Sequence, residues 1–261
     1  KGENTRHLRP TLFDFLAHRA LEYFVTDELD LTKPAYQFSI NDPKAFAPAA
    51  EFVKTSFATK DTSSLHHKAI VLLQDILQFH LADAKPDALL DADLIRLNFI
   101  QQYAVNENKE KLYEAALKNI EDNYADNAAA AQAMYLRARI YYGKGQDFDP
   151  FTKTDNQYEI KRAKELCEVA VKKFPKSEGG INCQNLLTQI VEPSLSLETE
   201  QVNVPGQPFR TLVKYKNAKT VFFRIVKTSK AEIEKADRRD YEKLWKDVIA
   251  LTSMKSWSVN M

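Results

Sequence analysis

Histidines are the side chains here best suited to acid–base chemistry or metal binding, because imidazole titrates near neutral pH and ligates transition metals. The sequence has five of them. His66 and His67 are adjacent and would point to different faces of a helix, and His80 lies outside the His-Glu-x-x-His spacing of zinc enzymes. His18 follows Asp14 by four residues, which predicts an ordinary surface pair on one helix face. The spacing therefore predicts no metal site.

Motifs of other enzyme classes are missing from the sequence. It contains no Gly-x-Ser-x-Gly nucleophile elbow and no Gly-x-x-x-x-Gly-Lys phosphate loop, and it has only six glycines. Carboxylates are abundant, but no spacing singles out two of them as an acid–base dyad. We therefore predict a chain that is not an enzyme and that needs no cofactor.

The two cysteines, Cys167 and Cys183, lie eight residues before and after Pro175. In a helical hairpin that turns at this proline, they would be level with each other on the two helices. Two alternatives stay open. The thiols fill a tight helix crossing as a buried pair, or they form a disulfide, which needs Cα atoms closer than about 7 Å and an oxidising compartment.

Three tyrosines, Tyr135, Tyr141 and Tyr142, lie on the second helix of the predicted central hairpin, next to an inserted loop at residues 143–156. One alternative is that they pack against the neighbouring repeat. The other is that they form an interaction surface for a peptide or a glycan, because helical solenoids use their concave faces to bind extended ligands.

These side chains are positioned by a helical hairpin that occurs twice between Leu112 and Ile190. A shift of fifty residues places apolar positions on apolar positions, with the spacing of three and four that marks one buried helical stripe. The matched pairs are Ala116–Leu166, Leu117–Cys167, Ile120–Ala170, Tyr124–Phe174, Ala133–Cys183, Leu136–Leu186 and Ile140–Ile190. After the turns, Asn127 and Ser177 are predicted to cap the second helices.

A weaker copy lies forty-one residues upstream and consists of Ile76, Phe79, Ala92, Ile95 and Phe99. Two antiparallel helices cannot bury their own apolar face, so the copies must stack. The pattern is similar to tetratricopeptide repeats, whose period is about 34 residues. The inserted loop accounts for the longer spacing here.

Helical spacing also precedes the repeats. A helix is predicted to begin at Thr11, with Asp14 in its first turn. Its expected apolar face is formed by Phe13, Leu16, Ala20, Tyr23 and Phe24. A second helix is expected from Pro48 to Phe57.

Strand-like alternation replaces helical spacing near Pro193. It covers Leu195 to Leu197, residues 209–215 and residues 221–225, and a last strand is predicted to begin at Trp257. A capping box at Ser229 and Glu232 opens a helix near residues 230–250. We therefore predict a mainly α chain: stacked helical hairpins in residues 1–192, then a partial β-sandwich with one inserted helix in residues 193–261. Four strands are fewer than the roughly seven of a complete sandwich.

The composition limits the partners of the chain. A net charge of +1 provides no basic field for nucleic acid, so no nucleic-acid partner is expected. No apolar run approaches the roughly 20 residues that span a bilayer. Membrane attachment is therefore expected only through an anchor outside this chain.

Parts of the sequence resemble a known family. Residues 193–200 (PSLSLETE), 204–208 (VPGQP) and 215–226 (YKNAKTVFFRIV) resemble the first macroglobulin sandwich of bacterial alpha-2-macroglobulins. Residues 9–20 (RPTLFDFLAHRA) resemble the opening of the helical extension that one branch of this family carries. Neither Cys167 nor Cys183 matches the Cys-x-Glu-Gln thioester motif of the family.

The resemblance implies a protease-trapping protein of the bacterial cell envelope, in the periplasm or at the outer membrane. This chain would be its non-catalytic scaffold and interaction region, and proteases would be engaged by parts beyond it. The alternative is a peptide- or glycan-binding module of the outer membrane with a helical-repeat groove. The strand-rich residues after Pro193 favour the first hypothesis.

Overall fold

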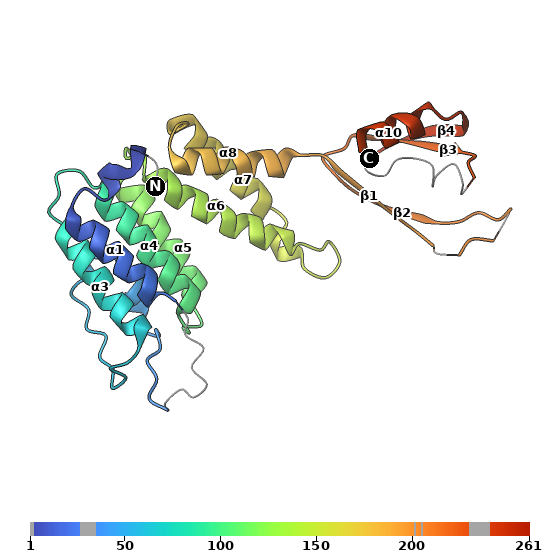
Figure 1. Cartoon of the computed structure of the whole chain (residues 1–261). Coiled ribbons are helices and arrows are strands. Elements are labelled where there is room, and N and C mark those ends of the chain that lie inside the picture. Colours follow the sequence, from blue (N-terminus) through green and yellow to red (C-terminus); the bar gives the residue numbers. More distant parts are fainter. Residues whose placement is uncertain (1–2, 27–34, 201, 205, 230–240) are drawn as a thin grey trace. The chain divides into compact units, whose positions relative to one another are not determined.

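The computed structural model describes residues 3–26, 35–200, 202–204, 206–229 and 241–261. The chain divides into two compact units, Lys1–Ile190 and Val191–Met261, which are described separately (Figure 1). The first unit is helical and the second contains the strands. The prediction of a mainly α chain with a small β part is thereby confirmed.

The helical unit consists of antiparallel hairpins that follow one another along the chain (Figure 1). In chain order its elements are η1 (Glu3–Leu8), α1 (Leu12–Phe24), η2 (Pro43–Phe46), α2 (Ala49–Phe52), α3 (Leu65–His80), α4 (Asp87–Tyr103), α5 (Lys109–Asn123), α6 (Ala130–Gln146), η3 (Thr154–Asn156), α7 (Glu159–Lys173) and α8 (Glu178–Val191). Helix α3 packs on α4, α5 on α6, α6 on α7 and α1 on α3. Helix α8 follows α7 after a short turn and shares an apolar cluster with α6 and α7.

The fifty-residue repeat is visible in the helix bounds. Helices α5 and α7 have the same length, and α7 begins fifty residues after α5 begins. The upstream copy was predicted 41 residues before the α5–α6 copy. In the structure α3 begins at Leu65 and α5 at Lys109, so the first helices of the two copies are 44 residues apart. With this shift Leu73 and Ile76, both fully buried, take the places of Leu117 and Ile120. The 41-residue shift had placed Phe79 in the buried stripe; this was wrong, because Phe79 is 48% exposed.

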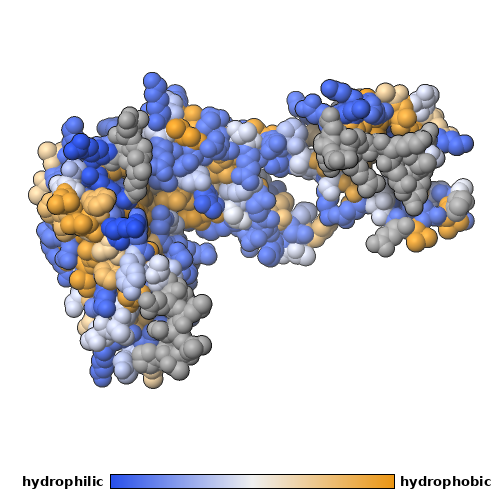
Figure 2. Space-filling model, in the orientation of Figure 1, coloured by the Kyte–Doolittle hydropathy of each residue, from blue (hydrophilic) through white to orange (hydrophobic). Residues whose placement is uncertain are grey.

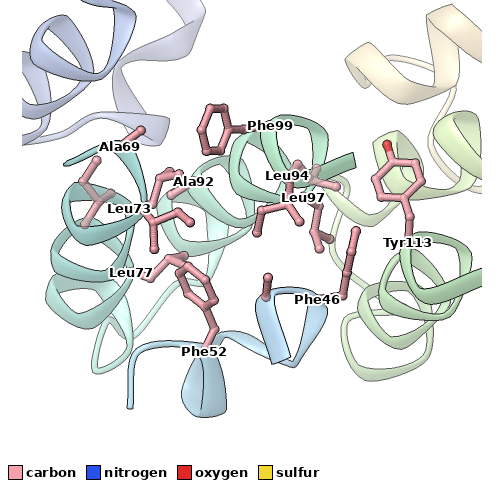
Figure 3. Packing of buried hydrophobic residues seen from close by; sticks show 14 of the residues in the cluster. Phe46, Phe52, Ala69, Leu73, Leu77, Ala92, Leu94, Leu97, Phe99 and Tyr113 are labelled. Carbon is pink, nitrogen blue, oxygen red and sulfur yellow. The ribbon is translucent and has the colours of Figure 1, made fainter. Parts of the chain in front are cut away.

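The larger of two apolar clusters fills the space between α3, α4 and α5 and reaches η2 and α2. Figure 3 shows Phe52 pointing from α2 toward Leu77 of α3, and Phe46 reaching from η2 toward α4 and α5. Burial of each such side chain stabilises the unit by about 1.5–3 kcal/mol before entropy is counted. The second cluster joins α6, α7 and α8 and includes both cysteines.

Two predicted helix ends were wrong. Helix α2 ends at Phe52 rather than Phe57, because the Gln74 amide donates to the carbonyls of Phe52 and Thr55, 2.8 and 2.7 Å away, and holds the chain outside a helix. Helix α6 continues to Gln146, so the inserted loop begins after it and not at residue 143.

Helix α1 begins as predicted, with a capping box between Thr11 and Asp14, but of its expected apolar face only Phe24 packs against the larger apolar cluster. The buried residues are Asp14, Ala17, His18 and Leu21, whereas Phe13, Leu16 and Tyr23 are exposed. A hydrogen bond of 2.6 Å from His80 of α3 to the Asp14 carboxylate contributes to this orientation, because it holds the side of α1 that carries Asp14 inward.

The second unit contains β1 (Ser194–Thr199), β2 (Thr211–Lys216), β3 (Thr220–Val226), α10 (Tyr241–Ala250) and β4 (Ser253–Asn260). Strands β1 and β2 form one antiparallel sheet and β3 and β4 a second. The last strand begins at Ser253, four residues before the predicted start, and its Trp257 ring stacks on Phe223 at 5.2 Å. The predicted capping box at Ser229 and Glu232 extends outside the described residues. In the described part of this unit, Val221 is the only buried hydrophobic residue.

Candidate binding groove along helix α5

A pocket of about 260 Å³ opens between α5 and the segment around η2. Its walls are mostly apolar, and the buried Asp93 and Arg96 of α4, here called its floor, also line it. The wall residues are Pro43, Phe46, Ala47 and Pro48 on one side and Leu112, Ala115, Ala116 and Asn119 on the other. Because two of the four residues on the α5 side are alanines, a ligand can approach the helix backbone closely at Ala115 and Ala116.

The floor of this pocket is a buried ion pair. Arg96 is 1% exposed, and its guanidinium donates to the Asp93 carboxylate at 2.7 and 2.8 Å and to the Ala45 carbonyl at 2.5 Å. The Phe52 ring lies 4.4 Å beneath it. Burial raises the pKa of Asp93 and lowers that of Arg96, and each charge opposes the shift of the other. The floor is thus polar but rigid and electrically neutral overall.

A second, more open cavity of about 510 Å³ adjoins the first and shares Ala115 and Asn119 with it. It is lined by Lys111, Glu114, Ala115, Lys118, Asn119 and Asp122 of α5 and by Arg137 of α6. Lys118 and Asp122 form an exposed pair at 2.6 Å. We call these two cavities together the α5 groove: a mostly apolar pocket and a trough of mixed charge that meet at Ala115 and Asn119 of α5.

The α6 side of the α5 groove is held by a chain of hydrogen bonds. Arg137 donates to Glu121 and, at 2.8 Å, to the Tyr141 hydroxyl, which in turn donates to Glu114 at 2.6 Å. Burial raises the pKa of Glu121 to about 7, against the opposing effect of Arg137. Burial also raises the pKa of Tyr141, and the Glu114 carboxylate adds to that shift. These contacts stabilise the α5–α6 hairpin and fix the trough wall.

The three predicted tyrosines do not line the α5 groove. Tyr141 is 3% exposed and lies within the network just described, under the Arg162 guanidinium at 4.3 Å, which is the packing alternative for this residue. Tyr135 and Tyr142 are half-buried and pack against the second apolar cluster. The packing alternative therefore describes all three better than the binding alternative.

Both cysteines are free thiols and fully buried. A hydrogen bond with Cys167 raises the pKa of the Cys183 thiol, and burial raises it further. The structure therefore agrees with the first of the two alternatives, in which Cys167 and Cys183 are a buried pair of thiols between α7 and α8.

The histidines occupy structural positions. His18 is buried and does not lie at the surface as predicted. Asp14 pairs with His80 of α3 and not with His18. His80 lies between two carboxyl groups: its Nε2 is 2.6 Å from Asp14 Oδ1 and its Nδ1 is 2.6 Å from Asp83 Oδ2. His67 Nε2 lies 2.8 Å from the Phe57 carbonyl. Among the residues that the structure describes, no cluster of three metal-ligating side chains occurs.

Sequence reasoning missed the pocket floor and the trough wall. The available signal was a charged residue inside an apolar helical stripe, as at Asp93 and Arg96 of α4 and at Arg137 of α6. Such a residue is rarely buried without a partner. The partner of Arg137 is sixteen residues away on another helix, so the pair could not be read from one helix alone.

Within the described ranges, no helix combines the length and hydrophobicity needed to cross a bilayer. Comparison with protein-family models, with curated proteins and with solved structures finds no match to this chain.

Proposed function

We propose that this chain is a non-catalytic interaction region whose helical unit binds an extended protein segment in the α5 groove. We further propose that it belongs to an alpha-2-macroglobulin-like, protease-trapping protein of the bacterial envelope.

The α5 groove is the observation that carries the binding proposal. An apolar pocket accepts one side chain of a segment, and the adjoining trough offers lysine, carboxylate and amide groups for its backbone and polar side chains. The buried pairs Asp93–Arg96 and Glu121–Arg137 hold the walls in place, so little ordering entropy is lost on binding.

A protein segment suits the α5 groove better than a glycan, which is the second candidate. Sugar rings stack their apolar faces on exposed aromatic rings. Among the lining residues described, Phe46 is the one aromatic side chain, and it is 4% exposed. Asn119, which both cavities share, is exposed and can pair with a peptide group through its carbonyl and its amide.

The strand unit supports the family proposal. Its two antiparallel sheets include the segments at residues 194–199, 211–216 and 220–226 that carry the resemblance. Their apolar side chains, such as Leu195, Leu197 and Phe222, are about half-exposed or more. Sheets with uncovered apolar faces are expected where further strands complete a sandwich.

A binding experiment tests the groove. Fluorescence anisotropy would measure binding of labelled twelve-residue peptides from an unfolded model protein, carboxymethylated lactalbumin, to the chain and to two variants. Ala115→Arg fills the α5 groove, whereas Ala125→Arg makes the same change at an exposed site outside it. We expect micromolar binding, at least tenfold weaker in Ala115→Arg and unchanged in Ala125→Arg.

Equal binding by both variants, or binding of labelled dextran or mannan in place of the peptides, would contradict the binding proposal. The family proposal is tested separately by sequencing the coding region that follows residue 261. Further macroglobulin-type sandwich domains there would support it, and an unrelated fold would refute it.

A further inference from the structure

Helix α1 presents an apolar surface to the outside of the helical unit. This surface, the α1 patch, consists of Leu12, Phe13, Phe15 and Leu16 of α1 and Phe79 of α3. These side chains are 37–72% exposed, and the rings of Phe13 and Phe79 are in contact, with centroids 4.7 Å apart. Figure 2 shows apolar side chains gathered on the face of the helical unit where α1 lies.

The orientation of α1 is fixed by polar contacts on its opposite side. Asp14 is fully buried and accepts hydrogen bonds from the backbone N–H and the hydroxyl of Thr11, both at 2.8 Å, and from His80 at 2.6 Å. A rotation that buried the α1 patch would expose or unpair this carboxylate. Because a buried unpaired charge is costly, the contacts of Asp14 hold the apolar side of the helix in solvent.

The size of the α1 patch matches that of a protein interface. From the exposed fractions and the usual size of these side chains, it presents on the order of 600 Å². The largest apolar patch of a typical monomer is about 300–600 Å². Two such patches facing each other would bury at most about 1,200 Å², where the range of stable specific interfaces begins.

The charges around the α1 patch suit a second copy better than a bilayer. Arg19 and Glu22 lie on the outward side of the same helix and form an exposed pair at 2.9 Å. Arg19 and Glu22 cancel, and the exposed Asp75 lies one helical turn before Phe79 on α3, so an anionic lipid surface finds no excess of cations to attract it. Between two copies, by contrast, Arg19 of each can face a carboxylate of the other. Two-fold dimers are the commonest closed assemblies and tend to have apolar interfaces.

We propose that the α1 patch is a self-association surface through which two copies of this chain form a two-fold dimer. The interface is centred on Leu12, Phe15 and Leu16, with Arg19 and Glu22 at its rim. Its small area makes the dimer a weak one, which forms at micromolar concentrations.

Sedimentation equilibrium of the whole chain between about 1 and 200 µM tests this proposal, because that range covers a micromolar Kd. Leu16→Glu is the disrupting variant, and Ile181→Glu on α8, which replaces a residue of similar exposure (51% against 57%), is the control. We expect a monomer–dimer equilibrium for the wild type and Ile181→Glu, and at least a tenfold larger Kd for Leu16→Glu. Circular dichroism should show equal helix content in all three proteins, because both residues are exposed.

Three outcomes would overturn the proposal. The first is a wild-type chain that is monomeric at 200 µM, the top of the range set by a micromolar Kd. The second is a dimer that Leu16→Glu leaves intact, or that both variants weaken equally. The third is a monomeric chain that binds phosphatidylcholine–phosphatidylglycerol vesicles and loses this binding in Leu16→Glu, which would assign the α1 patch to lipid.

Discussion

Replacement of His18 by methionine is expected to remove a specific part of the acid sensitivity of the helical unit. His18 is 4% exposed, and burial lowers its pKa from 6.5 to about 4, with smaller electrostatic effects from Arg9, Asp14, His80 and Glu22. Between these two pH values the unfolded chain binds a proton at this histidine and the folded chain does not. Stability therefore falls as the pH falls from about 6.5 to about 4.

The magnitude follows from the pKa difference. Each pKa unit corresponds to about 1.4 kcal/mol, so a shift from 6.5 to about 4 gives a loss of up to about 3 kcal/mol across this range. Methionine has a similar size and no ionisable group, so the variant lacks this contribution. Other buried acids, including Glu121 with a pKa near 7, titrate in the same range with the opposite sign, but they do so equally in both proteins.

The assay is urea unfolding at several pH values between 7 and 4, followed by circular dichroism at 222 nm. The quantity to compare is the difference in unfolding free energy between the wild type and His18→Met at each pH. We expect this difference to change by about 3 kcal/mol in favour of the variant on acidification. Parallel stability curves would refute the reasoning, because His18 would then have the same pKa in the folded and unfolded chains.

Further expectations concern the packing of the helical unit. His80→Leu should lower the unfolding free energy by about 3–5 kcal/mol, because it leaves the buried Asp14 carboxylate unpaired. Denaturant titration should show recovery of much of this loss in the double variant with Asp14→Leu, and equal losses would argue against the pairing. Gly179→Ala should cost at least about 1–3 kcal/mol, since the added Cβ would lie 2.2 Å from the α6 backbone. Gly143→Ala, in a helix position with free space, should instead stabilise by about 0.5–1 kcal/mol in the same titration, and the opposite order would contradict the α6–α8 packing. Leu136→Asp should lower the melting temperature of the helical unit, because this half-buried residue packs against the larger apolar cluster. An unchanged value would contradict the repeat alignment.

Local spacing was sufficient to predict the repeated hairpin and the strands. The fifty-residue shift relates α5 to α7 because both helices keep the same three- and four-residue stripe, and stripe and capping residues depend on the segment alone. The capping box at Thr11 and the cap at Ser177, which accepts the Gly180 N–H at 3.0 Å, are local in the same sense. Alternation of side chains likewise marked β1, β2 and β3.

Contacts between distant segments decided what local spacing could not. The outward apolar face of α1 depends on His80, sixty-six residues from Asp14 along the chain. The α5 groove exists only because η2, α4 and α6 meet around α5, and Tyr141 is buried in a cluster of α6, α7 and α8 where Glu114 and Arg162 contact it from other helices. A helical stripe fixes which residues can share a face. Whether that face lies in the core or in water depends on the free energy of burying the opposite face, and that is set by its partners in the folded chain.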